Sequence, residues 1–343
     1  MNELNSYNIL TLAKQIILPI EERNYKGWDL FDGLNSRIFK RTFLYKSRIL
    51  RLIWIQFFKK SPVNFRKIAK IPKGHNAKGL SLFIKGYINI FQLEKKDEYL
   101  QKAYKLADII ISQGAKDRSY FCVGYNFHWE ARAFTVPPFT PNMIVSSFVG
   151  QSFLDLYDID KNSSWLDLVI DIAYFIEKEL LVYQSDSEVC FGYIPNESVR
   201  VHNANLMGAR LLARLFTITK EEKYKYFAEK SVNYSINAQR RDGAWEYGEE
   251  NHHKWIDNFH TGFNLVAIKE VQQYLQINVW NENIKRGLDF HLKYHFLDDM
   301  TPKYFNNKLY PIDIHNFAQG IDTLCVFGNT MNAKKMLDNS MMY

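Results

Sequence analysis

The apolar and polar positions of the chain follow a pattern that recurs five times. In each occurrence a few polar residues precede a glycine, and apolar residues then follow at helical spacing. The five stretches begin at His75, Ile144, His202, Asp257 and Asp313, and their glycines are Gly79, Gly150, Gly208, Gly262 and Gly320. A glycine inside a helix costs about 1 kcal/mol relative to alanine. Its recurrence predicts that neighbouring helices approach closely at these points.

A second kind of helix separates these stretches and has a more polar face. The segments that predict it are DEYLQKAYKLADIIISQ, SSWLDLVIDIAYFIEKELL, EEKYKYFAEKSVNYSINAQ and NENIKRGLDFHLKYH. The repeating unit is therefore an inner apolar helix followed by an outer amphipathic one. Five such units, with a diverged sixth near residues 7–60, favour an all-α fold. We expect an α/α toroid in which five to six helical hairpins close into a ring as a single domain, 1–343, with an open solenoid as the alternative.

The loops that follow the outer helices also repeat, and each ends near a tyrosine. These tyrosines are Tyr125, Tyr193, Tyr247 and Tyr304. Equivalent loops of successive hairpins lie on one rim, where short aromatic runs could pair as small β-ribbons. The loop from Gly243 to Asn264 adds two tryptophans, three histidines and four acidic residues. That mixture is typical of a pocket wall that holds a polar, ring-shaped ligand.

Composition fits a globular protein without a membrane span. Apolar residues make up 47% and charged residues 24% of the 343 positions, while aromatic residues reach 15%. The cysteines, Cys122, Cys190 and Cys325, are scattered, which indicates a reducing compartment and buried thiols. The first residues lack the pattern of a signal peptide, and no long uncharged apolar run occurs. We therefore expect a cytoplasmic protein, with a peripheral place at the inner membrane left open.

Positive charge is concentrated in one part of the chain. Between Gly33 and Leu93 there are 14 Lys or Arg and no Asp or Glu, although the whole chain carries +7. Within it, a basic segment at residues 37–73 contains a predicted helix whose apolar positions are Leu50, Ile53, Trp54, Phe57 and Phe58. Such a helix could lie on an anionic membrane surface, or it could be an ordinary packed helix with a solvated basic face. No nucleic-acid-binding fingerprint accompanies the charge, so we expect no nucleic-acid partner.

Four motifs resemble those of a known family. They are GWDLFDGLNS (Gly27–Ser36), HNANLMGARLLARLF (His202–Phe216), DGAWEYG (Asp242–Gly248) and WIDNFHTGFNL (Trp255–Leu265). These motifs look like those of bacterial exopolysaccharide-biosynthesis proteins of the VpsJ-like type. More distantly, the repeat is similar to the toroid domains of uronyl C5-epimerases, polysaccharide lyases and several glycosidases. The first family implies a place in the synthesis of a bacterial surface polysaccharide, with a polysaccharide or a lipid-linked oligosaccharide as partner, and it implies no residue roles. Helix N-termini gathered at the rim favour anionic groups, so we expect the glycan to be acidic.

Candidate site residues follow from chemistry and position alone. We expect catalysis from Asp257, His260, Glu246, His202 and Tyr247. Substrate contacts are expected from amides, rings and acids at the same rim: Asn203, Asn205, Trp245, Trp255, Tyr193, Tyr125, His75, Asn76, Asp313, His315 and Asp32. The simpler interpretation is that many of these are helix caps or core aromatics.

Two reaction types fit these residues. A uronate epimerase or lyase needs donors for the sugar carboxylate and a base, for which Asn, His and Tyr are suited. A glycoside hydrolase needs two carboxylates, and Glu246 with Asp257 is the pair to test, with Asp313 in reserve. A glycan-binding protein without catalysis is the third alternative. We expect neither a cofactor nor a metal, because the sequence lacks HExxH, a P-loop and GxGxxG.

Overall fold

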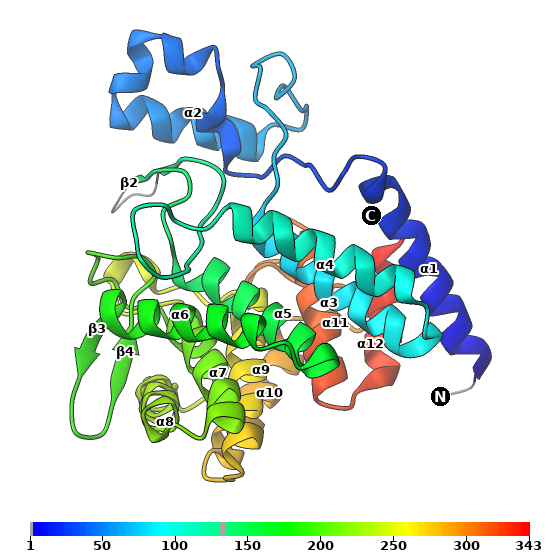
Figure 1. Cartoon of the computed structure of the whole chain (residues 1–343), viewed down its shortest axis with the longest axis vertical. Helices are drawn as coiled ribbons and strands as arrows, with labels where there is room; N and C mark the ends of the chain where they lie inside the picture. The colour runs from blue at the N-terminus through cyan, green and yellow to red at the C-terminus, as the bar shows by residue number, and fades with distance from the viewer. Residues whose placement is uncertain (1–2, 131–134) are drawn as a thin grey trace. The chain divides into compact units, whose positions relative to one another are not determined.

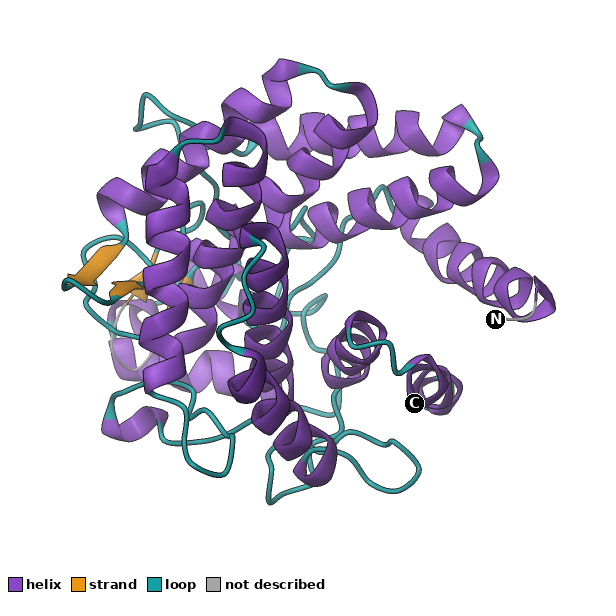
Figure 2. Cartoon of the chain, turned by 90° about the horizontal axis from the view of Figure 1, so that it is seen from below, coloured by secondary structure: helices purple, strands orange, loops and turns teal. Residues whose placement is uncertain are grey.

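The computed structural model describes residues 3–130 and 135–343 and is built mainly of helices, with short links inside the helix pairs and longer loops between many of them (Figure 1). Two compact units are formed, Met1–Ile172 and Ala173–Tyr343. The strands are confined to two short antiparallel ribbons, β1–β2 and β3–β4 (Figure 2). The predicted all-α class with small ribbons in the loops is therefore confirmed.

The first unit contains the helices up to α5 and the whole basic segment, residues 37–73. Its α-helices are α1 (Glu3–Glu21), α2 (Arg48–Lys60), α3 (Ala77–Glu94), α4 (Asp97–Ser112) and α5 (Met143–Asp160), and α6 (Ser163–Glu179) crosses the boundary. Three 3-10 turns, Asp32–Asn35, Phe39–Arg41 and Phe43–Lys46, precede α2, and β1 (Trp129–Glu130) pairs with β2 (Thr135–Val136). Helix α3 packs against both α4 and α5.

The second unit repeats the helix pair three times. After β3 (Leu181–Gln184) and β4 (Val189–Phe191) come α7 (His202–Thr219), α8 (Glu222–Asn237), α9 (Asn258–Leu275), α10 (Asn281–Tyr294), α11 (Ile314–Val326) and α12 (Thr330–Ser340). The inner helices α7 and α11 both pack against α9, and each outer helix packs against the inner helix before it. Inner helix α7 is buried along most of its length, as its apolar sequence predicts.

The turn between inner and outer helix has one geometry in four of the pairs. Each inner helix ends at a left-handed residue, which is Lys95, Lys161, Lys220 or Gln276. The N–H of that residue bonds back to the carbonyl four residues earlier, which stops the helix and turns the chain. The repeat seen in the sequence is thus a repeat of backbone conformation.

The expected sixth hairpin near residues 7–60 is wrong. Helix α1 contacts the α3–α4 pair, where Glu21 accepts hydrogen bonds from Lys102 Nζ at 2.8 and 3.0 Å. Helix α2 packs instead on the 3-10 turns before it, with Trp54 stacked on Phe39 at 4.4 Å. A short chain of turns, which hydrophobic periodicity does not reveal, separates these two helices.

The recurrent glycines differ in whether a neighbouring helix comes too close for a side chain at that position. A Cβ at Gly262 would lie 2.8 Å from Thr323 Oγ1, so this glycine allows the close approach of α9 and α11. A Cβ at Gly320 would lie 2.7 Å from Met336 Sδ of α12. At Gly79, by contrast, the nearest atom would be 3.8 Å away. Close approach is confirmed at the first two positions and is wrong at Gly79.

Single β-bridges hold two rim loops over the starts of inner helices. Val201, just before α7, pairs with Gly248, and Asp257, just before α9, pairs with Phe305. At Gly248 a Cβ would lie 2.5 Å from the Arg200 carbonyl oxygen, so only glycine fits. These bridges place Tyr247 and Tyr304, one residue before each pairing position, beside the helix N-termini.

Two expectations from composition have different outcomes. Among the described residues, every helix is too short or too polar to cross a bilayer. Cys122 and Cys190 are buried free thiols as expected, whereas Cys325 is exposed. The expectation of a buried thiol is wrong at Cys325, which lies near the end of α11.

Candidate functional site

An aspartate–histidine pair forms at the start of α9. Asp257 is the N-cap, and its Oδ1 accepts a hydrogen bond from the His260 backbone N–H at 2.9 Å. Its Oδ2 lies 2.7 Å from His260 Nδ1 and also accepts the Trp255 Nε1–H at 3.1 Å. The carboxyl is buried, whereas the His260 side chain is 20% exposed. With Nδ1–H donated to the carboxylate, Nε2 is left as the proton acceptor.

Aromatic rings from the preceding loop surround the imidazole of His260. Tyr247 stacks on Trp255 with ring centres 4.7 Å apart and planes at 12°, and its ring centre is 4.6 Å from that of His260. The surrounding protein desolvates the Tyr247 hydroxyl and raises its pKa, and negative charge on Tyr193 and Asp257 raises it further. The hydroxyl is therefore a hydrogen-bond donor at neutral pH.

The next repeat adds a second group of rings. Phe259 stacks on His315 at 4.6 Å, and Tyr304 meets Phe259 edge-on at 6.2 Å. Asp313 caps α11 by accepting the His315 backbone N–H at 2.9 Å. Burial raises the pKa of Tyr304 to about 12, and the carboxylates of Asp257 and Asp313 contribute to the shift. The pKa of the Tyr304 phenol is therefore raised by the N-cap carboxylates of two successive inner helices, α9 and α11.

We call the pair Asp257–His260 the dyad. The dyad group consists of the dyad and the rings that these contacts join to it, namely Tyr247, Trp255, Phe259, Tyr304 and His315. Tyr193 and Asp313 lie beside it. Tyr304 and Phe259 are not among the predicted site residues. The signal for Tyr304 was its place among the recurrent loop tyrosines.

Glu246 lies in the same loop but pairs with a lysine. Its carboxylate is 2.7 Å from Lys254 Nζ, and its side chain is partly exposed. Lys254 lies one position before Trp255, so this ion pair ties the two ends of the loop together. Glu246 is thereby engaged within the loop that carries the stacked rings.

Other predicted residues of this unit make contacts inside the α7–α8 hairpin. His202 is buried with Nδ1 3.3 Å from Ser235 Oγ, and burial lowers its pKa to about 4. Asn205 donates to the Ser231 carbonyl and accepts the Phe191 N–H. Trp245 is buried and donates to the Ser235 carbonyl. These contacts give His202, Asn205 and Trp245 a structural role inside the protein.

Asn203 differs from its neighbours in α7. It is buried, and in the part of the chain that the structure describes its Oδ1 has no hydrogen-bond partner. A buried amide oxygen without a partner is uncommon and is suited to receive a ligand hydroxyl.

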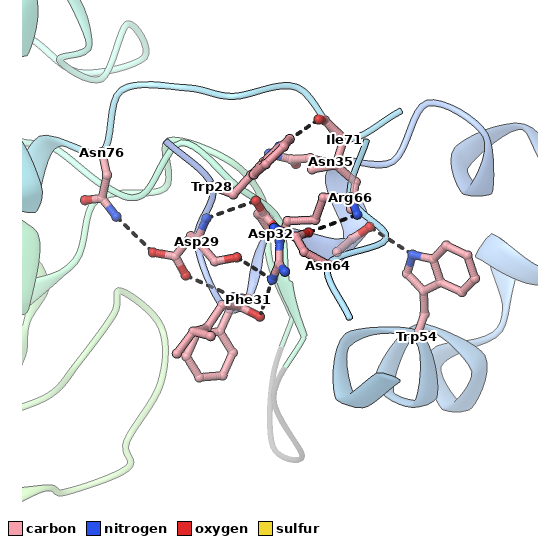
Figure 3. Close-up of polar contacts among 12 residues, drawn as sticks. Trp28, Asp29, Phe31, Asp32, Asn35, Trp54, Asn64, Arg66, Ile71 and Asn76 are labelled. Atoms are coloured by element: carbon pink, nitrogen blue, oxygen red, sulfur yellow. Dashed lines mark hydrogen bonds and ion pairs between the residues drawn. The ribbon is translucent and has the colours of Figure 1, made fainter. Parts of the chain in front are cut away.

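The remaining candidates belong to the first unit. Asn76 caps α3 and donates from Nδ2 to Asp29 Oδ2 at 3.1 Å, while Asp32 Oδ1 accepts from Arg66 Nε at 2.7 Å (Figure 3). Trp28, Asp29, Asp32 and Asn76 line a cavity of about 290 Å³. His75 Nε2 is 2.7 Å from the Asn24 carbonyl oxygen, and Tyr125 stacks on Phe127 at 5.0 Å.

Asp29 is a half-buried acid that lines this cavity beside the buried Asp32, and it is not among the predicted site residues. Its Oδ1 accepts the Phe31 N–H at 3.0 Å, and burial raises the pKa of its carboxyl. Burial also lowers the pKa of Lys78 to about 8, an effect that Asp29 opposes. Lys78 does not line the cavity, but Asp29, Asp32 and Asn76 do, so its wall carries polar and ionisable groups beside the Trp28 ring.

No metal-binding arrangement is found in residues 3–130 and 135–343, where no three His, Cys, Asp or Glu side chains converge. No protein-family model matches the chain, and no curated protein matches it. The resemblance to VpsJ-like proteins therefore stays a prediction.

Solved structures do match the fold. The Lin0763 protein from Listeria innocua is 14% identical, with a TM-score of 0.59, over 82% of this chain and 76% of its own. Cellobiose 2-epimerase from Bacillus thermoamylovorans is 11% identical, with a TM-score of 0.56, over 92% of this chain and 86% of its own. The α-1,6-mannanase GH76A of Salegentibacter, solved as an inactive variant with α-1,6-mannotriose, is 14% identical, with a TM-score of 0.54, over 90% of each chain. These likenesses show the fold and confirm the α/α-toroid class predicted from the repeats.

Proposed function

We propose that the protein binds a glycan and transfers a proton on one of its sugar residues, with His260 as the base. The observation that carries this proposal is the 2.7 Å contact between Asp257 Oδ2 and His260 Nδ1 beside a partly exposed imidazole. The carboxylate fixes the tautomer and orientation of the ring, so that Nε2 faces away from it with a free lone pair. A base held in this way suits abstraction of a proton from carbon next to a carbonyl group.

The chemistry fits epimerisation, isomerisation or elimination. His260 Nε2 takes the proton from the carbon, and the electron pair moves onto the carbonyl oxygen. The Tyr247 hydroxyl, kept protonated at neutral pH, is the donor that would stabilise the resulting oxyanion. Return of the proton to the opposite face gives an epimer, whereas loss of a group from the next carbon gives an elimination product. One structural neighbour, the cellobiose 2-epimerase from Bacillus thermoamylovorans, is named for a reaction of the first kind.

The charges at the dyad group favour a neutral sugar residue there. Helix N-termini attract anions, but those of α9 and α11 are already capped by Asp257 and Asp313. A uronate carboxylate beside these two aspartates would be repelled. The acidic glycan expected from the sequence would then carry its charge on a residue outside the dyad group.

Hydrolysis by Glu246 and Asp257 is the second candidate function. It requires one carboxyl that stays protonated and one that stays ionised across the glycosidic bond. In the structure Glu246 pairs with Lys254, and Asp257 accepts bonds from His260 and Trp255. Both carboxyls are thus engaged by donors of the protein itself, which argues against a role for either one in protonating a leaving group.

The biological setting we propose is the synthesis of a bacterial surface polysaccharide, with a lipid-linked oligosaccharide as a substrate. This part rests on the motif resemblance of Gly27–Ser36, His202–Phe216, Asp242–Gly248 and Trp255–Leu265 alone.

Deuterium exchange tests the proposal. The protein is incubated in heavy water with reducing disaccharides of glucose or mannose and, separately, with uronate oligosaccharides, and NMR follows deuterium at C2 or C5. We expect exchange at C2, lost in His260→Gln and kept in His252→Gln, because His252 is an exposed histidine of the same loop. New reducing ends without exchange would instead identify a hydrolase, and binding without either change would identify a glycan-binding protein.

A further inference from the structure

The basic segment, residues 37–73, carries an exposed apolar stripe on α2. Ile49, Ile53 and Phe57 follow one another at intervals of four residues and therefore share one face of the helix. Their exposed fractions are 70%, 58% and 46%. Large apolar side chains gathered on a surface, rather than scattered singly, mark a site of interaction.

The buried face of α2 holds the helix in place, and Phe57, at the end of the stripe, adds a stacking contact with Phe65 at 5.7 Å. Ile55 and Phe58 are buried, and Trp54 both stacks on Phe39 and donates from Nε1 to the Gly33 carbonyl at 2.9 Å. The sequence predicted one apolar face that included Ile53, Trp54, Phe57 and Phe58. The structure divides these residues between a packed face and an exposed one.

More exposed apolar residues occur in the same basic segment. Phe43 is 81% exposed, and Ile38, Leu44, Val63 and Ile68 are exposed as well. Lysines and arginines alternate with them, and the exposed ones include Arg37, Lys40, Arg41, Lys46, Lys60, Lys67 and Lys70. The stripe together with these residues is called the apolar–basic patch below.

Acidic side chains neutralise only part of this charge. Glu130 pairs with Arg48 and Arg51, and Asp32 pairs with Arg66. The segment itself contributes no counter-charge, since no Asp or Glu occurs between Gly33 and Leu93. The surface that results combines insertable apolar side chains with cations, and its electrostatic complement is a surface of phosphates.

We propose that the apolar–basic patch docks the protein on an anionic lipid bilayer. The stripe would enter the boundary between headgroups and acyl chains, while lysines and arginines contact lipid phosphates. This inference does not depend on the proton-transfer proposal, although a lipid-linked substrate would give membrane attachment a use. A bilayer is favoured over a soluble acidic polymer because a polymer would leave Ile49, Ile53 and Phe57 in water.

Vesicle co-sedimentation of the full chain tests the docking. Vesicles of phosphatidylcholine are compared with vesicles that also contain phosphatidylglycerol, at low and high salt. We expect binding only to the anionic vesicles and its loss at high salt. Replacing Ile49, Ile53 and Phe57 by serine should weaken binding more than about tenfold. Lys60→Gln with Lys67→Gln should weaken it by about tenfold.

A matched variant replaces three exposed apolar residues outside the patch, Leu82, Leu93 and Val279, by serine and should bind vesicles like the wild type. Unchanged circular dichroism and thermal midpoints verify that each variant is folded. The proposal is overturned if anionic vesicles do not bind, or if the stripe variant binds them as well as wild type. It is also overturned if heparin binds equally to both proteins while vesicles bind neither, or if the stripe variant only converts a dimer into a monomer.

Discussion

Asp257 binds His260 twice, once through the backbone N–H at the helix cap and once through the imidazole Nδ1. The first contact starts α9, and the second orients the ring. A single side chain therefore both starts the helix and orients the imidazole on which the proposed proton transfer depends. Because one carboxylate oxygen caps the helix and the other contacts Nδ1, a substitution that changes only the second group can separate the two roles.

Asp257→Asn should nearly abolish proton exchange. The amide oxygen can still cap the helix, but the NH₂ group would then face both Nδ1 and the Trp255 Nε1–H. His260 would have to accept at Nδ1, so Nε2 would carry the proton and could not act as a base. We expect a rate loss of about 10²- to 10⁴-fold and a stability loss of about 1–2 kcal/mol. Asp299→Asn changes an exposed aspartate whose Oδ1 likewise accepts a backbone N–H, from Thr301 at 2.8 Å, and should keep the rate within about threefold, as exchange NMR and urea denaturation can measure. Full activity of Asp257→Asn would rule out the dyad as the base.

Tyr247→Phe should slow the reaction without weakening binding. The phenyl ring keeps its stack on Trp255, whereas the hydroxyl donor is lost. Removal of one oxyanion donor typically costs about 10²-fold in rate. Trp255→Ala should weaken glycan binding, since it removes an apolar ring face, and should also slow the reaction, since it removes the Nε1–H that Asp257 Oδ2 accepts. Titration calorimetry and exchange rates separate the two effects, with Tyr294→Phe on the exposed side of α10 as the control. A Tyr247→Phe variant that loses only affinity would contradict the donor role.

Acidification should destabilise the fold from about pH 6.5 downward. His291 and His295 are buried with their Nδ1 atoms 3.1 Å apart, and burial lowers the pKa of His291 to about 3 and that of His295 well below its usual value. Burial lowers the pKa of His202 to about 4. Because the folded pKa values are depressed, the unfolded chain takes up protons first, so this stability is present above about pH 6.5 and falls toward pH 4. Each histidine should account for about 2 kcal/mol between pH 7 and pH 5.

Urea denaturation at both pH values measures this linkage. His202→Asn should reduce the loss between pH 7 and pH 5 by about 2 kcal/mol. Leu206→Ala, a cavity variant in the same helix, should lower stability by about 2–5 kcal/mol at both pH values and leave the difference unchanged. An unaltered pH difference in His202→Asn would show that His202 is not a neutral buried histidine.

Gly262→Ala should destabilise the protein, and Gly86→Ala should stabilise it. A methyl group at Gly262 would meet Thr323 Oγ1 at 2.8 Å and Gln319 Cγ at 3.0 Å, which would force α9 and α11 apart at a cost of about 1–3 kcal/mol. Gly86, inside α3, has no atom within 4 Å of the added methyl, so only the helix propensity gain of about 1 kcal/mol remains. Equal effects in the two variants, measured by urea denaturation, would contradict the packing role of Gly262.

The sequence was informative where local geometry decides the outcome. Helical periodicity predicted the helix pairs, because an inner helix buries its apolar face whatever the position of its pair in the fold. The Asp257–His260 contact was also within reach, since an N-cap and the third helical residue always lie close together. Tyr247 and Tyr304 could be placed near the helix starts from the repeat alone.

Residues whose role depends on a distant partner could not be assigned in this way. His202 and Asn205 occupy repeat positions like those of rim residues, but Ser231 and Ser235 of α8 take up their polar atoms. The raised pKa of the Asp29 carboxyl depends on the surrounding loops, which desolvate it. The division of α2 into packed and exposed faces depends on Phe39, which stacks on Trp54 from a 3-10 turn that has no periodic signature.

The shared role of Asp257 also bears on how such proteins diverge. A chain with asparagine at this position would keep its helix start and most of its stability, yet its imidazole would be locked in the inert tautomer. On the proposed mechanism, one codon change would therefore remove proton transfer and leave the ring-lined surface around Tyr247 and Trp255 in place.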